Sequence, residues 1–312
     1  MSRTIRLGTR GSPLALAQTR WVMGRLTAYY PDYHFEPVII KTTGDKLKDV
    51  PLAQVGGKGL FIKEIEEALL AGEVEMAVHS LKDMPAELPA GCVLAAVPVR
   101  EDWRDALISR RYGSLAEIPA GGRIGTGSLR RRVQILHRRP DVEVVHLRGN
   151  VDTRLRKMET QGLDAIILAA AGLNRLGLKH LPCTFLPAAE MLPAVSQGAL
   201  GLEVRADDEE MRRLLRVLDD PPSRVAVTAE RAFLSRLEGG CLVPVAALGI
   251  VADSQVTLEG MISDLDGRRL LRERLSGAAV EAEAIGRRLA DRLLEKGGRE
   301  ILAQIYGRPL VP

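Results

Sequence analysis

A short run that begins at His79 places a lysine and a carboxylate side by side in front of a proline. The run reads His79-Ser80-Leu81-Lys82-Asp83-Met84-Pro85. Residues 74–79 alternate apolar side chains with others, which predicts a strand. Because Pro85 excludes a long helix, Lys82 and Asp83 are expected in a tight turn beyond the carboxyl end of that strand, where open α/β sheets bind ligands. The alternative is a capping box, Ser80-x-x-Asp83, on a one-turn helix.

A second candidate is Cys241, which lies in a loop sequence between two glycines and a proline. The run is Glu238-Gly239-Gly240-Cys241-Leu242-Val243-Pro244. Most lone cysteines are small buried hydrophobic residues, but this setting makes Cys241 a better than average candidate for a working thiol. The three cysteines of the chain are far apart and form no CxxC pair, which argues against a disulfide framework or a zinc site.

Positive charge is concentrated between residues 123 and 157, where ten Lys or Arg face three acidic residues. A confined basic patch indicates a discrete anionic ligand, and aromatic residues, at 4%, are too few for an obvious nucleic-acid stacking platform. Arg130 and Arg131 fall in the first turn of an expected helix, where the helix dipole disfavours cations by ~0.3–1 kcal/mol each. A bound polyanion would remove this conflict. The alternative, solvated arginines on helix faces, suits Arg138, Arg139 and Arg156 better.

Strand–loop–helix units are expected to position these side chains. Strand 4–9 leads through Arg10 to a helix that Ser12 caps, and the amide groups there favour an anion. Two similar units follow, with strands near 124 and 142–147 and helices near 129 and 151. The glycine-rich loop around Lys58 lacks the spacing of a phosphate-binding P-loop.

The length of 312 residues predicts two or three domains. Crossovers near 98–104 and 193–198 would connect two α/β lobes around a hinged cleft, which Arg175 and Gln197 could face. Pro221-Pro222 marks the next boundary, before a small α+β domain with three strands. The predicted domains are 1–98 with 199–219, then 104–193, then 222–312. No apolar run reaches the 18 or so residues of a membrane span, and no signal-peptide core is found, so we expect a cytoplasmic protein.

Seven motifs, taken together and in this order, resemble the porphobilinogen deaminase (hydroxymethylbilane synthase) family. They lie at residues 9–15, 55–61, 78–85, 125–131, 147–154, 193–201 and 238–244. Two positions depart from the family pattern: Gln54 stands where a lysine is expected, and Gly127 replaces a serine. Both weaken the resemblance at those two positions only.

The resemblance implies two α/β domains of the type II periplasmic-binding kind, followed by an α+β domain with an antiparallel three-stranded sheet. It implies a transferase that joins four porphobilinogen molecules head to tail into hydroxymethylbilane and releases four ammonia molecules. The implied cofactor is a dipyrromethane linked by a thioether to Cys241. The implied protein is a monomer that uses neither metal nor nucleic acid nor membrane.

The residues fit that chemistry. Loss of ammonia from an aminomethylpyrrole leaves a cation, which the Asp83 carboxylate could stabilise with Lys82 beside it. A thiol is a soft nucleophile suited to capturing the electrophilic methylene. Substrate and cofactor carry carboxylates, which guanidinium groups bind well. The residues expected to bind these carboxylates are Arg10, Ser12, Lys58, Ser80, Thr126, Ser128, Arg130, Arg131, Arg148, Arg154, Arg175 and Gln197.

Two other functional classes remain open from the residues alone. A non-catalytic anion-binding protein on the same two lobes would need neither Cys241 nor a third domain. A nucleic-acid-binding protein using residues 123–157 would lose affinity steeply with salt.

Overall fold

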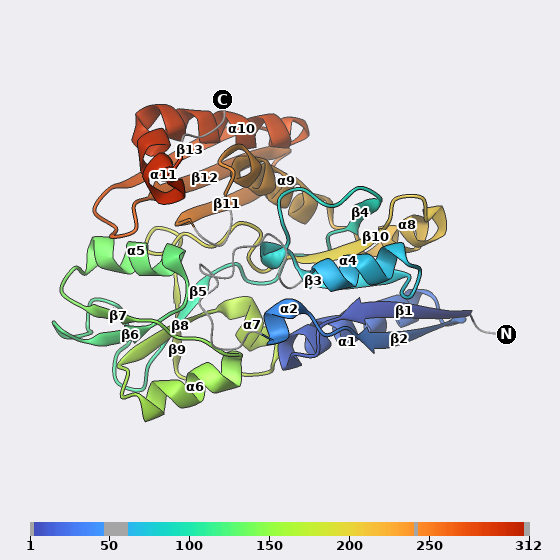
Figure 1. The fold of residues 1–312 in the computed structure, drawn as a ribbon, viewed down its shortest axis with the longest axis horizontal. Helices are drawn as coiled ribbons and strands as arrows, with labels where there is room; N and C mark the ends of the chain where they lie inside the picture. The colour runs from blue at the N-terminus through green and yellow to red at the C-terminus, as the bar shows by residue number, and fades with distance from the viewer. Residues whose placement is uncertain (1–2, 47–61, 240–242, 309–312) are drawn as a thin grey trace. The chain divides into compact units, whose positions relative to one another are not determined.

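The computed structural model in Figure 1 describes residues 3–46, 62–239 and 243–308. Its contacts divide the chain into two compact units. The first consists of Met1–Glu101 with Gly198–Arg224, and the second of Asp102–Gln197 with Val225–Pro312. No helix within the described residues is long and apolar enough to cross a membrane.

The first unit is built on a five-stranded mixed sheet with the strand order β2-β1-β3-β10-β4. The strands are β1 (Arg3–Thr9), β2 (Tyr33–Ile39), β3 (Met76–Ser80), β4 (Cys92–Ala96) and β10 (Leu200–Arg205). Strand β1 is parallel to β2 and β3, whereas β10 is antiparallel to both β3 and β4. The chain thus returns from the second unit to complete the first sheet.

The helices of this unit are α1 (Pro13–Tyr29), α2 (Thr43–Lys46), α4 (Lys63–Leu70) and α8 (Glu209–Leu215). Helices α1, α4 and α8 pack on the sheet with buried apolar residues. Helix α1 begins as predicted, since the Ser12 hydroxyl accepts a hydrogen bond from the Ala15 amide at 3.2 Å and Pro13 takes the first helical position. Val22 and Leu26 of this helix are fully buried with Ile5 of β1.

The second unit begins with another five-stranded sheet, whose order is β7-β6-β8-β5-β9. The strands are β5 (Asp105–Ile108), β6 (Arg123–Gly125), β7 (Glu143–Val145), β8 (Ala165–Ala169) and β9 (Cys183–Leu186). Here too three parallel strands are followed by one antiparallel strand, β5. The accompanying helices are α5 (Leu129–Arg138), α6 (Val151–Thr160) and α7 (Ala170–Arg175).

The C-terminal part of the second unit is a three-stranded antiparallel sheet packed on helices. Its elements are β11 (Val245–Ala252), β12 (Gln255–Ser263), β13 (Leu270–Ala278), α9 (Pro221–Arg236, which starts in the first unit), α10 (Ala282–Leu293) and α11 (Arg299–Tyr306). Phe233 lies at the centre of this core, fully buried. A Cβ at Gly260 of β12 would come within 2.7 Å of its ring, so only glycine fits there.

These sheets confirm the predicted fold class, two mixed α/β sheets and one antiparallel three-stranded sheet.

The second α/β sheet and the C-terminal sheet share one apolar seam, formed by Val133, Leu192, Ala246, Leu248 and Met261. Polar contacts reinforce this seam, because Arg272 of β13 donates to the Ala188 carbonyl at 2.8 Å and His137 Nδ1 lies 2.9 Å from the Gly267 carbonyl oxygen. The division of the second unit into two domains stays a prediction.

Candidate active site

The turn that carries Lys82 and Asp83 is a single 3₁₀ turn, Leu81–Asp83, which follows β3 directly. Two buried residues hold its ends: Leu81 donates its amide to the Ala199 carbonyl at 3.0 Å, and the Met84 amide bonds back to Leu81 at 3.2 Å. Asp83 between them is exposed and Lys82 is half-buried. The fold therefore presents the carboxylate on a turn whose two ends are fixed.

Ser80 takes the N-cap position of this turn, but its side chain makes no capping hydrogen bond. Instead its hydroxyl pairs with the amide of Gln18, with 2.8 Å to Nε2 and 3.1 Å to Oε1. The capping-box alternative is therefore not observed. Gln18 is 3% exposed and belongs to α1, so this helix braces the turn. The sequence analysis missed it, although a glutamine on the apolar face of a helix is a signal that could have been noticed.

Arg10 and Ser12 lie at the same edge of the first sheet as the turn that carries Asp83. Strands β1 and β3 are adjacent and parallel, with Leu7 opposite Met76, so the segments leaving their carboxyl ends are neighbours. Arg10 is half-buried there, and the Ser12 hydroxyl accepts from the amide of Ala15. The predicted anion-binding groups and Asp83 thus come from one edge of one sheet.

In the second unit, Arg130 and Arg131 are buried and share one carboxylate, that of Asp105. Arg130 Nη1 lies 2.7 Å from Asp105 Oδ2, and Arg131 binds Oδ1 through Nη2 at 2.7 Å and Nε at 3.0 Å. Gln197 donates to the same Oδ1 at 2.9 Å. Burial alone would raise the pKa of the fully buried Asp105, but the two guanidiniums outweigh it and hold that pKa well below its usual range. The sequence analysis missed this central carboxylate.

The charges of this cluster do not balance. Among the described residues, Asp105 is the only carboxylate that contacts either guanidinium, so two positive charges face one negative charge. Burial lowers the pKa of Arg130; the Asp105 carboxylate opposes this shift and the neighbouring Arg131 adds to it. Arg130 Nε is buried, and no hydrogen-bond partner is found for it in the described part of the chain. A ligand carboxylate would supply both the missing charge and the missing acceptor.

The loop before α5 is fixed by its own hydroxyl groups. Thr126 is 4% exposed and its hydroxyl accepts from the Ser128 amide at 3.2 Å, while Ser128 caps α5 by accepting from the Arg131 amide. A Cβ at Gly127 would lie 2.6 Å from the Leu147 carbonyl oxygen, so the backbone as it stands requires glycine. Gly127 replaces the serine of the family pattern, and in this protein the chain just after β7 passes too close to Gly127 to leave room for a side chain.

Further cations gather on the neighbouring loop and helix. Burial, followed by the positive charges of Arg148, Arg154 and Lys157, lowers the pKa of His146. Arg154 Nε donates to the Gly149 carbonyl at 2.8 Å, at the start of the helix that Asn150 caps. Because β6, β7 and β8 are parallel neighbours, the segments carrying Ser128, Arg148 and the helix of Arg175 leave from one edge of the second sheet.

Arg139 corrects one expectation. We expected a solvated side chain, but its guanidinium donates to Asp141 at 2.7 Å and to the Leu115 and Ile118 carbonyls at 2.6 and 2.7 Å. It ties the end of α5 to the loop before β6, so the solvated interpretation is wrong for this residue. Arg156 is exposed, as expected.

Cys241 and Lys58, together with Gln54, lie outside the described residues. The other two cysteines are poorly suited to act as nucleophiles, because the thiolate is the reactive form. Burial, then the charges of Glu203 and Glu66, raises the pKa of Cys92 to about 12. Burial likewise raises the pKa of Cys183.

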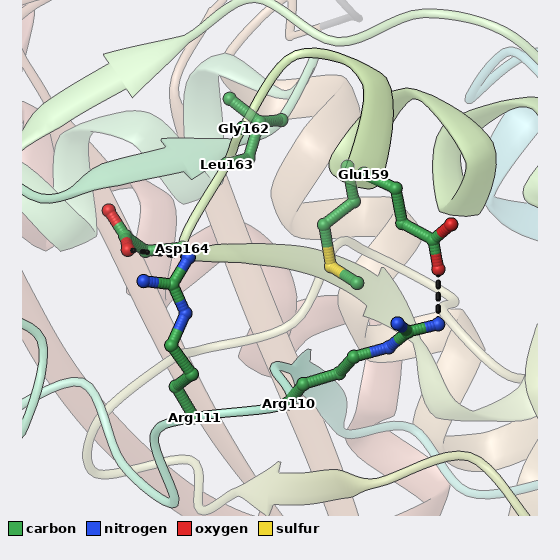
Figure 2. A pocket seen from close by; sticks show the side chains of 7 residues that line it. Arg110, Arg111, Glu159, Gly162, Leu163 and Asp164 are labelled. Atoms are coloured by element: carbon green, nitrogen blue, oxygen red, sulfur yellow. Dashed lines mark hydrogen bonds and ion pairs between the residues drawn. The ribbon is translucent and has the colours of Figure 1, made fainter.

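A pocket of about 240 Å³ lies elsewhere in the second unit (Figure 2). It is lined by Arg110, Arg111, Met158, Glu159, Gly162, Leu163 and Asp164. Its arginines already face carboxylates, since Arg110 pairs with Glu159 and Arg111 lies 3.7 Å from Asp164. The pocket contains none of the predicted site residues.

Across the described ranges, no three His, Cys, Asp or Glu side chains gather as metal ligands would.

Two family models cover most of the sequence. "Porphobilinogen deaminase, dipyromethane cofactor binding domain" matches residues 5–213, and "Porphobilinogen deaminase, C-terminal domain" matches residues 225–295. The chain belongs to the porphobilinogen deaminase family. The predictions of an enzyme of this family and of a dipyrromethane cofactor are thereby confirmed.

Curated porphobilinogen deaminases align with the chain over nearly its whole length. That of Syntrophus aciditrophicus (strain SB) is 54% identical over 306 residues, covering 98% of this chain and 100% of the relative. That of Syntrophobacter fumaroxidans (strain DSM 10017 / MPOB) is 51% identical over 304 residues, covering 97% of this chain and 98% of the relative. That of Geobacter metallireducens (strain ATCC 53774 / DSM 7210 / GS-15) is 52% identical, covering 98% of this chain and 96% of the relative.

Proposed function

We propose that this porphobilinogen deaminase makes hydroxymethylbilane from four porphobilinogen molecules on a dipyrromethane primer attached to Cys241, with Asp83 at the reacting centre. Family membership supports the reaction. One structural observation supports the choice of carboxylate-binding residues. Arg130 and Arg131 share the single carboxylate of Asp105, and the buried Arg130 Nε has no acceptor among the described residues. A cluster with an excess positive charge and an unused donor suits a ligand rich in carboxylates.

The donor set fits the dipyrromethane, whose acetate and propionate groups are carboxylates. Arg130, Arg131, Arg148 and Arg154 would hold those groups, with Thr126 and Ser128 fixing the loop between them. When bound, the dipyrromethane supplies the pyrrole carbon to which the first substrate is added. Arg10, Ser12, Lys58, Ser80, Arg175 and Gln197 are proposed to orient the carboxylates of substrate and cofactor.

Asp83 would act on the charge that develops when ammonia leaves. Its carboxylate sits on a turn with fixed ends, so little reorganisation is needed as the cation forms. The same carboxylate can accept the pyrrole N–H. Lys82, half-buried beside it, would donate to a substrate carboxylate. The enzyme is further proposed to act as a cytoplasmic monomer without a metal ion or nucleic acid.

The direct test is the absorbance of uroporphyrin formed from porphobilinogen after oxidation of the product. The purified chain should produce it, and dialysis against a chelator should leave the rate unchanged. A chain that binds porphobilinogen without product would be an anion-binding protein instead. Salt-sensitive binding to any DNA duplex, without turnover, would favour the nucleic-acid class.

The arginines provide a second prediction. Arg148→Leu should reduce loading of the dipyrromethane or raise the KM for porphobilinogen by ~10-fold or more, the scale of one lost charge-assisted bond. Circular dichroism should change little, because Arg148 is half-buried in a loop. The matched control is Arg156→Leu, on the exposed face of α6, which should behave like the parent. Equal losses in both variants would indicate a diffuse electrostatic effect and argue against a specific cradle.

A further inference from the structure

A buried pair of titratable groups lies on one face of the first sheet. Strands β3 and β10 pair with Gly201 opposite His79 and Glu203 opposite Ala77, which places His79 and Glu203 diagonally on the same face. His79 Nε2 lies 3.0 Å from Glu203 Oε2. Helix α4 packs against this sheet, as Figure 1 shows, and Ile65 and Leu69 of the helix share a buried cluster with Ala77. The pair is therefore sealed between sheet and helix.

Glu203 is an unusually isolated carboxylate. It is fully buried, His79 is 5% exposed, and neither Glu203 oxygen makes a well-aligned hydrogen bond to any described residue. The contact with His79 is within ion-pair distance but lacks hydrogen-bond direction, so the attraction depends on charge. A buried carboxylate is costly unless a positive partner compensates it. The His79 imidazole, 3.0 Å away, is the basic group placed to compensate it.

A third group, Glu66 of α4, joins the pair. Its Oε1 is buried without a hydrogen-bond partner in the described part of the chain. Burial, then the charge of Glu203, raises the pKa of Glu66 to about 7, and His79 opposes the shift. The other polar groups facing the cluster are Cys92 of β4 and Arg205 of β10, and Arg205 is engaged with the Leu69 and Val74 carbonyls and with Asp208.

The same two strands hold the catalytic turn. His79 is followed by Ser80 and then by the turn that carries Asp83, and Ser80 lies opposite Leu200. A change in the pairing of His79 with Glu203 would shift the end of β3 against β10. Misplacing a catalytic group by about 1 Å can reduce the rate by ~100-fold.

We propose that His79 and Glu203 are positioning residues, whose charge pairing locks the end of β3 to β10 and so fixes the turn that presents Asp83, with Glu66 setting the charge of the pair. This inference rests on the proposed role of Asp83. It assigns a function to two buried side chains, His79 and Glu203, and to the half-buried Glu66, none of which the reaction itself touches.

The test compares single and paired replacements. His79→Gln and Glu203→Gln should each lower kcat by ~10–100-fold while the KM for porphobilinogen changes by less than about threefold. The double variant His79→Leu/Glu203→Leu removes both charges, and such apolar replacements of buried ion pairs are commonly tolerated. It should regain the melting temperature of the parent without regaining kcat. Glu75→Gln, which breaks the Arg6–Glu75 ion pair just before the other end of β3, is the control and should keep the parental kcat.

A double leucine variant with parental kcat would overturn the proposal, because the pair would then serve stability alone.

If the variants at 79 and 203 do not fold, the variant Glu66→Gln provides the deciding measurement. The kcat of the parent should show a step near pH 7, the pKa of Glu66, and Glu66→Gln should remove it; superimposable profiles would overturn the proposal. Asp83→Asn, measured alongside, separates the two claims, since normal turnover in that variant would remove the role on which this inference rests.

Discussion

Asp83→Asn is expected to reduce the turnover of porphobilinogen by at least ~100-fold, the scale of losing one preorganised electrostatic group. The change keeps the shape of the side chain and removes its charge, so the developing cation loses its counter-charge. Asp83 is exposed, and both ends of its turn are held by backbone hydrogen bonds of other residues, so the fold should be unaffected. Single-turnover kinetics of ammonia release would measure the effect at the chemical step.

The control for this experiment is Glu87→Gln, since Glu87 is an exposed carboxylate on the same stretch of chain. It should retain the parental rate. Near-normal turnover in a folded Asp83→Asn variant would refute the assigned role.

Replacing Cys241 by serine is expected to abolish attachment of the dipyrromethane and, with it, activity. A thiol can capture an electrophilic methylene as a thioether, whereas a hydroxyl is a far poorer nucleophile at neutral pH. The parent should therefore be heavier than its sequence by two deaminated porphobilinogen units, and neither thiol reductants nor dialysis should remove them. Brief incubation with substrate should add further single units. Intact-protein mass spectrometry measures all of these changes.

The other cysteines are the internal controls. Digestion under denaturing conditions should place the extra mass on the peptide that contains Cys241 and leave Cys92 and Cys183 open to alkylation. Their raised thiol pKa values make both poor nucleophiles in the folded protein. An active preparation with the bare sequence mass, or with the adduct on another cysteine, would contradict the assignment.

Local signals predicted the elements around the site well, because caps and turns are encoded within a few residues. Ser12 caps α1 as predicted, and Ser128 and Asn150 cap α5 and α6 through the same kind of side-chain hydrogen bond. Strand β2 spans Tyr33–Ile39, with Pro37 in its interior. Proline is a signal against a strand interior, but β2 lies at the edge of its sheet, where no partner on the outer side needs the amide.

Long-range pairing could not be predicted in the same way. Asp105 lies 25 residues before Arg130 in the chain and 92 before Gln197, so no local pattern indicates that the three share one hydrogen-bonded cluster. The prediction for Arg139 was wrong for a related reason. Besides the nearby Asp141, the partners of its guanidinium are backbone carbonyls on another loop, which every sequence offers. Side-chain type shows which chemistry is possible, whereas tertiary pairing decides which groups are already engaged.

The place of β10 in the first sheet affects the order in which the molecule can be built during synthesis. Strand β10 lies between β3 and β4, and β4 pairs with no other strand of this sheet. The nascent chain must therefore emerge to residue 205 before the first sheet can close. All five strands of the second sheet lie within residues 105–186, so that sheet can be completed earlier. Until then β4, in the first-made part of the chain, is an unpaired edge that depends on a strand not yet made.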